Sequence, residues 1–571
     1  MNDNEKYLLV CSIGPVQDFI ATARTSHDLW FGSWMLSELS KAGARAIAGT
    51  SHPLIFPAHE KIEDLEPGST LSVANKIVAI VHGDPAAVAG RLAQSVRDHL
   101  EQIYDSTVGQ IKDGIDQELA REQVMDLVEL NWSSVPYHDE ASYPAARARA
   151  EALLAARKST RNFRQWQGRP GYHKSSLDGI RESVLLPGAD DDSPARNLAA
   201  PGEELSGVDL LKRCRGSDGA PAFRSTTDLA AAPFLLWLGE ERKQALLRSI
   251  KGLLQEYNTR RTETEGAHFY EERLAQLIED EDRRKEFRER LAGILPEGKA
   301  PSPYYALLRA DGDNMGRAIA AQRTPAAHRA LSLRISAFAS EARQTVLGHD
   351  GMPVYMGGDD LLAILPLHTA LQCVARLDEE FRTHMAGMSL EGGPGATAPS
   401  LSFGLVIAHH LTPLSDVLDL AGRAEREAKE IEGKNGLAIV LSKRSGTERT
   451  ISGKVRPLLE RMELLVKAVG QVSKGTPYEL ENLDRQLRLA GLGSETEAAQ
   501  QEAKRIIERK RESGGDSPAV AEVQEQLVDW LAEGATTLPQ LAYEMIVAGE
   551  FARARSTAGA SFFPATKEVQ P

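Results

Sequence analysis

The chain has 571 residues, of which 42% are hydrophobic and 26% are charged. This is the composition of a globular protein, and the length suggests about three to five folding units. A wholly disordered chain, a collagen-like fibre and a coiled-coil rod are therefore excluded. The 67 basic and 81 acidic residues give a net charge of −14. Because this charge repels polyanions, any contact with nucleic acid must be local or be made through partner subunits.

The sequence lacks the usual marks of membrane insertion and secretion. No run of about 18 apolar residues is present, so no transmembrane helix and no membrane partner are expected. The first residues, MNDNEKYLLVCSIG, have acids where a signal peptide requires bases. The cysteines, Cys11, Cys214 and Cys373, are too few and too scattered for a disulfide framework. These features predict a protein of the reducing cytoplasm.

Residues 1–150 are predicted to form a first palm domain with the ferredoxin-like order β–α–β–β–α–β. A short apolar run over 6–13 stops at Gly14-Pro15 and indicates a buried strand. Apolar residues spaced by three and four indicate helices, whereas alternation indicates further strands. The predicted strands are 6–13, 54–57, 71–83 and 124–137, and the predicted helices lie within 16–30, 32–49 and 86–104.

The same order returns in residues 299–445, which are predicted to form a second palm domain. Its elements are a strand at 303–313, a helix at 326–348, a hairpin with a Gly-Gly turn at 352–366, a helix at 369–386, a strand at 400–410, a helix at 415–433 and a last strand at 435–443. Residues 151–298 and 446–571 are predicted to form two helical domains. The fold class is therefore α+β, with two ferredoxin-like palms and two helical domains, and the repeat is architectural rather than residue by residue.

Acidic residues gather at one predicted edge of the second palm. In this fold the first and third strands are antiparallel neighbours, so the end of one meets the start of the other. Asp311 and Asp313 close the first strand, while Asp359 and Asp360 open the third. Clustered carboxylates repel one another unless a hard cation neutralises them, and Mg²⁺ is held by one or two carboxylates together with phosphate oxygens. We expect a Mg²⁺ (or Mn²⁺) site formed by Asp311, Asp359 and Asp360, with alternation allowing only one of the adjacent pair to be a direct ligand.

The residues around these acids suit a nucleotide such as ATP. In DGDNMG, a turn leads into a helix whose backbone N–H groups can hold phosphates. Glycines next to the acids leave room for a nucleoside. Lys429, on the helix after the closing strand, can reach phosphate oxygens. The expected nucleotide-binding residues are Gly312, Asp313, Asn314, Gly316, Gly357, Gly358 and Lys429, with Asp359 and Asp360 as the catalytic acids.

Each of these features has a purely structural explanation when taken alone. A single GGDD is most often a hairpin turn with solvated acids. DGDNMG alone could be a capped turn or a calcium-binding loop, although it lacks the bidentate Glu that ends an EF-hand loop. Two further motifs carry little weight. His27-Asp28 lacks the partner ligands of an HD nuclease site, and His409-His410 at a strand end is as readily structural as ligand-binding. The combination of GGDD, DGDNMG and Lys429 in the correct order within one palm is what makes the signal specific.

With these motifs the chain resembles the large palm-domain subunit of type III CRISPR effector complexes, especially the Cmr kind. IGPVQDFIATARTSHDLWFGSWMLSELS is similar to the first palm of that family, and DGDNMG, YMGGDDLLAILP and SFGLVIAHHLTPL are similar to its second, active palm. The second set also resembles nucleotide cyclases of the GGDEF type, with Asp360 in place of the Glu. The resemblance implies a pyrophosphate-releasing nucleotidyltransferase that condenses ATP into cyclic oligoadenylate in antiviral defence. It also implies other complex subunits, CRISPR RNA and target RNA as partners.

The chain departs from that family in two places. Many members carry an N-terminal HD nuclease domain, but here the first palm starts at about residue 6, so DNA cleavage is not expected. Many members also hold zinc with two Cys-x-x-Cys pairs. The matching places are KSSLDGIRES and EELSGVDLLKR, with Ser175, Asp178, Ser206 and Asp209 in the thiolate positions. Hydroxyls and carboxylates are poor ligands for a structural zinc, so no zinc is expected.

Three other functions remain open from the sequence. The same chemistry can join ATP to S-adenosylmethionine, because acceptor choice depends on the shape of the pocket. A non-catalytic scaffold is the alternative from a different class, against which the intact DGDNMG and GGDD argue. A free-standing diguanylate cyclase is disfavoured by the second palm. The first palm, which lacks a GGDD, is expected to hold the second nucleotide, and the helices after residue 446 are expected to dock other subunits.

Overall fold

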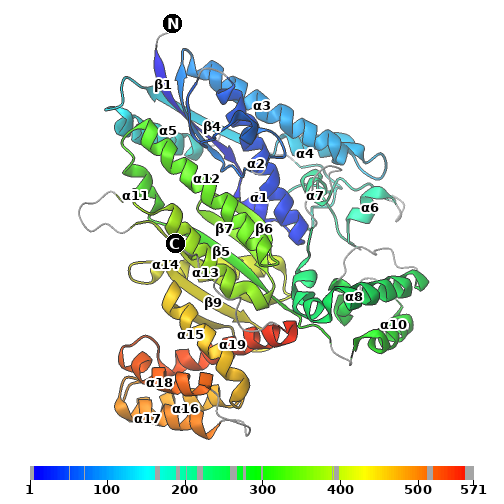
Figure 1. Cartoon of the computed structure of the whole chain (residues 1–571). Helices are drawn as coiled ribbons and strands as arrows, with labels where there is room; N and C mark the ends of the chain where they lie inside the picture. The colour runs from blue at the N-terminus through cyan, green and yellow to red at the C-terminus, as the bar shows by residue number, and fades with distance from the viewer. Residues whose placement is uncertain are drawn as a thin grey trace.

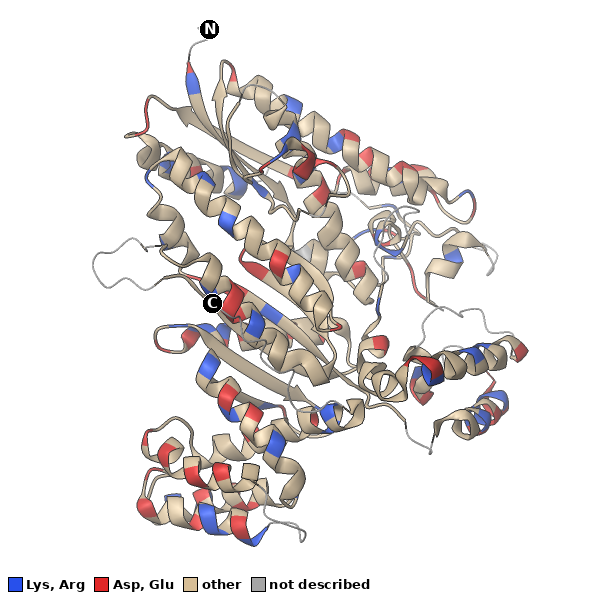
Figure 2. Ribbon diagram, viewed as in Figure 1, with Lys and Arg blue, Asp and Glu red and all other residues tan. Residues whose placement is uncertain are grey.

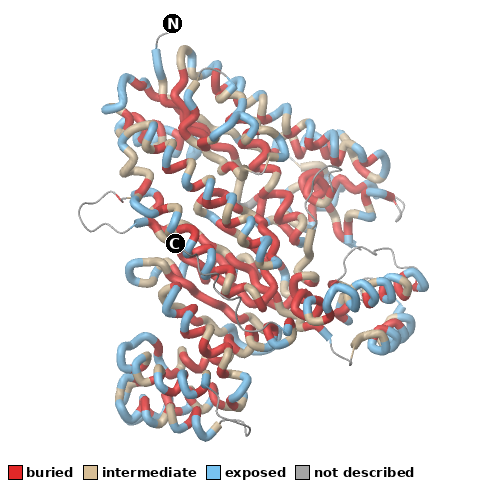
Figure 3. Tube along the Cα trace, in the orientation of Figure 1, coloured by how far each residue is buried: buried red, intermediate tan, exposed pale blue. Residues whose placement is uncertain are grey.

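The computed structural model confirms an α+β chain built around two sheets (Figure 1). It describes residues 5–49, 52–69, 71–160, 168–187, 193–200, 202–214, 223–257, 266–273, 278, 280–296, 300–388, 390, 398–510 and 518–559. The central strands of both sheets are buried along most of their length, whereas the outer helices alternate between buried and exposed residues (Figure 3). Charged side chains lie mainly on these helices (Figure 2).

The first sheet has the predicted ferredoxin-like topology. It consists of β1 (Lys6–Gly14), β2 (Leu54–Phe56), β3 (Lys76–His82) and β4 (Glu129–Pro136), in the order β2-β3-β1-β4 with every pair antiparallel. β1 is buried without a break from Leu8 to Ile13, because helices cover both faces of the sheet. The helices of this region are α1 (Gln17–Ala21), α2 (Ser26–Ala48), α3 (Pro85–Ser106), α4 (Gln117–Met125) and α5 (Tyr143–Ser159), of which α2 and α3 pack on one face of the sheet and α5 packs on the other. α4 is not among the predicted elements, and α5 packs on β1 and β4, so the first palm continues past residue 150.

The second sheet is larger than predicted. Its strands are β5 (Tyr304–Asp313), β6 (Met352–Gly357), β7 (Asp360–Leu365), β8 (Ser400–His409), β9 (Gly436–Ser442) and β10 (Arg449–Lys454). Their order is β10-β9-β8-β5-β7-β6, in which only β8 and β9 are parallel. β5 lies beside β7 as the ferredoxin-like order requires. The missed strand is β10, whose short polar sequence gives little alternation; it pairs with β9, so the sheet extends past residue 445.

The helices of the second palm cover both faces of its sheet. They are α11 (Met315–Ala320), α12 (Pro325–Gly348), α13 (Leu367–His384) and α14 (Leu414–Glu430). The side chains of α12 and α13 share a core with one face of the sheet, and those of α14 share a core with the other. Gly404 of β8 has no room for a side chain, since a Cβ there would lie 2.5 Å from the backbone nitrogen of Glu425. α14 therefore lies directly on β8, close to the end of β5.

Two helical regions complete the chain. The first contains α6 (Pro194–Leu198), α7 (Gly207–Arg213), α8 (Thr226–Glu256) and α10 (Glu281–Ile294), and the second contains α15 (Val455–Ala468), α16 (Thr476–Leu489), α17 (Glu497–Arg509), α18 (Pro518–Ala532) and α19 (Leu538–Ala558). α15 and α19 pack on the second palm through α13 and β10, so part of their apolar surface is used within the chain. Among the described helices, none is long and apolar enough to cross a membrane.

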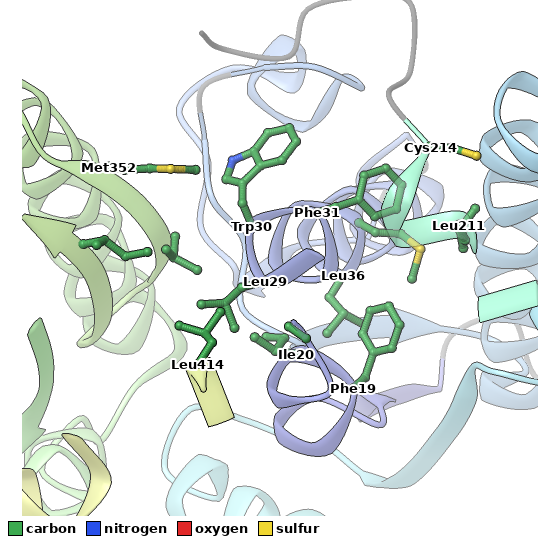
Figure 4. Close-up of a cluster of buried hydrophobic side chains, with 14 of the residues drawn as sticks. Phe19, Ile20, Leu29, Trp30, Phe31, Leu36, Leu211, Cys214, Met352 and Leu414 are labelled. Carbon is green, nitrogen blue, oxygen red and sulfur yellow. The ribbon is translucent and has the colours of Figure 1, made fainter. Parts of the chain in front are cut away.

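The two palms contact each other through equivalent elements. The long helix α2 of the first palm packs on the edge strand β6 of the second, and α12 of the second packs on the edge strand β2 of the first. Leu29 of α2 faces Leu414 at the start of α14, and Met352 of β6 lies near Trp30 (Figure 4). Because each helix covers an edge strand of the other palm, the sheets are held in one orientation.

A buried hydrogen bond crosses the interface between the palms. The hydroxyl of Tyr143 lies 2.6 Å from Nδ1 of His328 on α12, and both residues are buried. Burial, followed by the positive charges of Arg147 and Lys76, lowers the pKa of His328 to about 4. The ring is therefore neutral at physiological pH and accepts the charge only at a cost to folding.

His328 is expected to make the protein sensitive to acid. Its pKa is about 6.5 in an unfolded chain and about 4 in the folded protein, so the unfolded state binds the proton first. Stability should fall as the pH drops from about 6.5 to about 4, and His328→Gln should reduce this loss. Urea-unfolding midpoints measured across this range test the prediction. The exposed His138→Gln is the control, and parallel curves for wild type and His328→Gln would contradict it.

Candidate active site

The predicted meeting of β5 with a hairpin tip is present. The register pairs Ala306 with Leu365 and Ala310 with Leu361, so the end of β5 runs into the β6–β7 turn. Gly357 and Asp360 close this hairpin, and its two central residues are Gly358 and Asp359. The predicted Gly-Gly turn is thus displaced by one residue. Gly358 has φ +93°, and glycine at the first central position is the requirement of a type II′ turn.

Asp359 lies directly over the backbone of the DGDNMG segment. A Cβ placed on Gly312 would be 2.7 Å from Oδ2 of Asp359 and 2.8 Å from its Cβ. Only glycine permits this approach, so Gly312 is needed for close packing of the two motifs rather than for a left-handed backbone. Two segments that are distant in sequence therefore form one site.

The two adjacent acids experience different surroundings. Burial raises the pKa of Asp359. Burial also raises the pKa of Asp360 to about 7, with further contributions from the negative charges of Asp359 and Glu425. Asp360 is exposed at the sheet edge and Asp359 is half-buried. The raised pKa values therefore come first from burial, and at Asp360 also from neighbouring negative charge, an environment that is found at many functional sites.

Lys429 reaches the acidic edge from α14. Its Nζ forms an ion pair with Oδ2 of Asp311 and lies 3.0 Å from Oε1 of Glu425. Arg309, two residues before Asp311 on β5, pairs with Oε2 of Glu425 at 2.7 Å. Despite these partners, burial and the neighbouring charges of Lys434 and Arg309 lower the pKa of Lys429 to about 8. Positive and negative side chains thus alternate across the site.

The nucleotide contact expected of Asp313 does not fit its position. This carboxylate is fully buried and accepts hydrogen bonds from Ser400 Oγ at 2.7 Å, from Ser402 Oγ at 2.9 Å and from the backbone N–H of Asn435 at 3.0 Å. Since its oxygens are occupied within the protein, Asp313 is a structural residue. It joins the end of β5 to β8 and to the loop that follows α14.

The remaining residues of the two motifs differ in their surroundings. Asn314 turns the chain into α11 with φ +61°, a conformation that Asn tolerates well. Gly316 has open space where a side chain would lie. The room for a nucleoside expected at Gly357 is filled by the ring of Tyr355, with which a Cβ there would collide. The proposed contact at Gly357 is therefore closed in this arrangement.

Sequence reasoning missed three charged residues and a loop. Arg309 and Glu425 were overlooked, although Glu425 and Lys429 have the i, i+4 spacing that places side chains on one helix face. Lys434 was also missed; its backbone has φ +56° and its charge acts on Lys429. Asn435, next to it, donates to Asp378 Oδ1 and to the carbonyl of Leu401, which holds this loop against the palm.

The acids fit a cation that is held partly by phosphates. Among the residues that the structure describes, no three His, Cys, Asp or Glu side chains form a group able to hold a metal ion unaided. Asp359 lies over Gly312, the residue after Asp311 on β5, and Asp360 follows it at the start of β7. One or two carboxylates completed by phosphate oxygens and water are the usual ligands of Mg²⁺.

The residues at the expected thiolate positions do come together, but as a hydrogen-bonded cluster. Ser175 Oγ and Ser206 Oγ each donate to Oδ2 of the buried Asp209 at 2.6 Å. Asp178 instead pairs with Arg181 at 2.8 Å. Both hydroxyls direct their protons at Asp209, an arrangement that does not suit zinc, which is bound by sulfur and nitrogen in such sites.

The other two histidine motifs have structural contacts. Asp28 caps α2 through Thr25 and pairs with Arg213 at 2.7 Å, while Nδ1 of His27 lies 2.9 Å from the carbonyl oxygen of Lys212. His409 and His410 stack on each other at the end of β8 remote from the acids. Neither pair contributes to the acidic site.

Comparison with known protein families agrees with this architecture. Residues 304–438 match the family model described as Cas10/Cmr2, second palm domain, and residues 8–108 match that described as CRISPR-associated protein Cmr2, N-terminal. The first match runs from β5 to β9 and includes every acid and lysine of the site. The second covers β1 to α3 of the first palm.

Individual relatives are more distant. The chain is 25% identical over 549 aligned residues to the CRISPR system Cmr subunit Cmr2 of Pyrococcus furiosus, with 77% of this chain and 62% of that protein covered. It therefore spans less than two thirds of the relative's length.

Two solved structures have a similar fold. A type III-B Cmr-beta complex in the apo state gives a TM-score of 0.61 at 14% identity, with 90% of this chain and 78% of that chain covered.

The same complex bound to cognate target RNA gives a TM-score of 0.59 at 16% identity, with 90% of this chain and 80% of that chain covered. These two structures agree in fold, and the family models agree in sequence with both palms in the right order. The two matched segments of the chain are thus similar to the N-terminal and second palm domains of Cas10/Cmr2 proteins.

Proposed function

We propose that this chain is the large subunit of a type III CRISPR effector complex and that its second palm condenses ATP into a cyclic oligoadenylate. The observation that carries the proposal is the junction of Gly312 and Asp359, which brings DGDNMG and GGDD together without space for a side chain. A solvated hairpin turn requires no such contact. The lysine and arginine beside the acids supply the positive charge that a triphosphate needs.

The residues of the site divide into two groups. Asp311, Asp359 and Asp360 would hold Mg²⁺ or Mn²⁺, which when bound neutralises phosphate charge and lowers the barrier to phosphoryl transfer. Lys429 and Lys434 lie where they can contact the phosphates, and the Lys429–Asp311 pair would have to exchange when a triphosphate binds. Asn314 and Gly312 place the turn, and Asp313 holds it from below through Ser400 and Ser402.

The reaction needs one nucleophile and one leaving group. A ribose hydroxyl of one ATP forms a bond to the α-phosphorus of another, the α–β phosphoanhydride bond breaks, pyrophosphate departs and the hydroxyl proton is released. Lys429 stabilises charge that develops on the departing phosphates, which is worth more in a partly buried site than in water. Its side chain is 24% exposed, so it meets this condition.

The first palm offers a place for the second nucleotide. Ser12 on β1 pairs with Lys76 on β3, the position that corresponds to the β5–β7 edge of the second palm. A hollow of about 240 Å³ opens there, lined by Ser12, Asn75, Lys76, Glu151, Leu154, Ala155 and Lys158. It has two lysines where the second palm has acids, so it suits the anionic part of a nucleotide.

S-adenosylmethionine is the alternative acceptor. The Lys76–Glu151 ion pair of 2.5 Å supplies a carboxylate as well as a lysine to the first-palm hollow, and a carboxylate would favour a sulfonium cation. Mass spectrometry of products formed with ATP, with and without S-adenosylmethionine, separates the two reactions. The assay should use the complex assembled with guide and target RNA, since a structurally similar complex is described as bound to cognate target RNA.

Replacing Asp359 and Asp360, the two acids at the tip of the β6–β7 hairpin, should abolish catalysis without unfolding the protein. Asp359→Asn with Asp360→Asn removes the charges that hold the cation, and turnover of ATP should fall on the order of a hundredfold or more. Since the pKa values of both acids are raised, the charged forms oppose folding, and the metal-free variant should melt no lower than wild type.

The assay is pyrophosphate release by equally assembled, target-bound complexes, with melting temperature measured in chelator. Asp416→Asn with Asp419→Asn, which removes two exposed acids from the first turns of α14, is the charge-matched control. Turnover equal to wild type in the tip variant would exclude this edge as the active site, and no turnover by wild type would favour the scaffold function.

Lys429 should act on the phosphate chain rather than on the nucleoside. Lys429→Met is expected to weaken binding of ATP about tenfold, the loss of one charge-assisted contact, while binding of adenosine is unchanged. Isothermal titration with ATP, AMP and adenosine provides the comparison. Equal weakening for all three would show that the variant disturbs the fold of the site instead.

The first-palm hollow should account for one of two bound nucleotides. Lys76→Met with Lys158→Met is expected to reduce the stoichiometry of ATP binding from two to one and leave the second-palm site intact. The matched control is Lys251→Met with Lys285→Met, which removes two exposed lysines from α8 and α10. An unchanged stoichiometry would place the second nucleotide elsewhere.

A further inference from the structure

An arginine of the first palm, Arg147, is buried against α11, the short helix that follows the Gly312–Asn314 turn. Arg147 lies on α5 and is only 6% exposed. Its Nη1 donates to the carbonyl oxygen of Ile319 at 2.8 Å and to that of Gln322 at 3.2 Å. Ile319 is in the last turn of α11, and Gln322 follows the end of that helix. The guanidinium therefore caps the C-terminus of α11.

This cap satisfies a physical requirement of the helix. The last carbonyls of an α-helix have no partner within the helix and bear partial negative charge. A buried guanidinium is a strong partner for them, because it is charged and its N–H groups are fixed in direction. α11 has only six residues, so few internal hydrogen bonds hold it. Its position depends on its two ends.

The N-terminus of α11 directly follows the Gly312–Asn314 turn of the candidate site. The carbonyl of Asn314 accepts from the N–H groups of Arg317 at 2.9 Å and Ala318 at 3.0 Å. Met315, the first helical residue, is buried against Gly312, where a Cβ would lie 2.5 Å from its Cγ. A helix of this length spans about 9 Å. A contact that the first palm makes at the C-terminus of α11 can therefore fix the position of its N-terminus, which lies against Gly312 and Asp359.

Arg147 is itself held in place. Its guanidinium lies over the ring of Tyr143 at 5.7 Å from the centroid, and Tyr143 bonds His328 of α12 at 2.6 Å. The side chain is therefore held by Tyr143 of its own helix, which is itself fixed by the bond to the second palm.

We propose that Arg147 is a positioning residue for the second-palm active site: by capping α11 from the first palm, it holds the Gly312–Asn314 turn in the geometry that binds the nucleotide. The role of that turn rests on the proposed function, whereas the effect of Arg147 on the order of α11 does not. The first palm then contributes directly to the site of the second, in addition to any nucleotide that it binds.

Arg329 provides a matched control within the same interface. It lies on α12 and donates across the palms to the carbonyl oxygens of Leu54, at 2.6 Å, and His59. Arg329→Met therefore removes two arginine–carbonyl bonds between the palms, as Arg147→Met does, but none of them reaches α11. A role that is only structural predicts the same behaviour for both variants.

Two measurements on the full-length chain test the proposal. Amide hydrogen exchange without nucleotide should be about tenfold faster over residues 315–322 in Arg147→Met, the effect of losing a charged hydrogen bond, and unchanged there in Arg329→Met. The affinity for ATP with Mg²⁺ should fall by a similar factor in Arg147→Met only. Arg147→Lys, which keeps a donor and the charge, should recover part of both effects.

The outcomes distinguish the two hypotheses. If wild type binds no ATP, the proposed function fails, and the exchange data alone decide on the cap. Exchange over 315–322 that is the same in Arg147→Met and wild type would overturn the proposal, as would equal loss of ATP affinity in both methionine variants. If Arg147→Met does not fold, Arg147→Lys and Arg147→Gln are compared with Arg329→Gln by the same two measurements.

Discussion

Burial of carboxylates at one sheet edge, together with their mutual repulsion at Asp360, is the constraint on which the candidate site depends. Asp359 and Asp360 lie at the hairpin tip, Asp311 lies at the end of β5, and the charges of Asp359 and of Glu425 on α14 act on Asp360. Lys429 and Arg309 supply compensating charge, but the pKa of Asp360 still rises to about 7. Under the proposed function, a cation bound together with a phosphate chain would compensate the negative charge at this edge.

The surrounding structure holds these groups together against that repulsion. Glycine at 312 and at 404 allows the hairpin tip and α14 to approach the sheet closely. Asp313 fastens β5 to β8 through Ser400 and Ser402, and Asn435 attaches the loop after α14 to the same carboxylate. The buried Asp313 thus fixes the position of the end of β5, because a fully hydrogen-bonded network is rigid. The first palm adds further support, because its long helix α2 covers β6, the edge strand of the β6–β7 hairpin.

Much of this arrangement was predictable from local patterns. Apolar runs and turn residues located most strands of both palms, and the order of those strands implied that the end of β5 meets the tip of the β6–β7 hairpin. β10 and α4 were missed because their sequences are short and mixed, so tertiary packing rather than periodicity maintains them. The roles expected of Asp313 and Gly357 failed for a similar reason. Whether a carboxylate is buried, or a glycine is covered by Tyr355, depends on side chains from other elements.

The sequence by itself determined the two palms and the meeting of the DGDNMG and GGDD segments at one sheet edge, because periodicity and motif order are local properties that the chain carries along its length. Only the tertiary structure decided which charges meet there. Lys429 pairs with Asp311, Glu425 joins Lys429 to Arg309, and Arg147 reaches α11 from a different domain. These contacts join residues far apart in the chain, and their existence depends on distances of a few ångströms that no spacing in the sequence encodes.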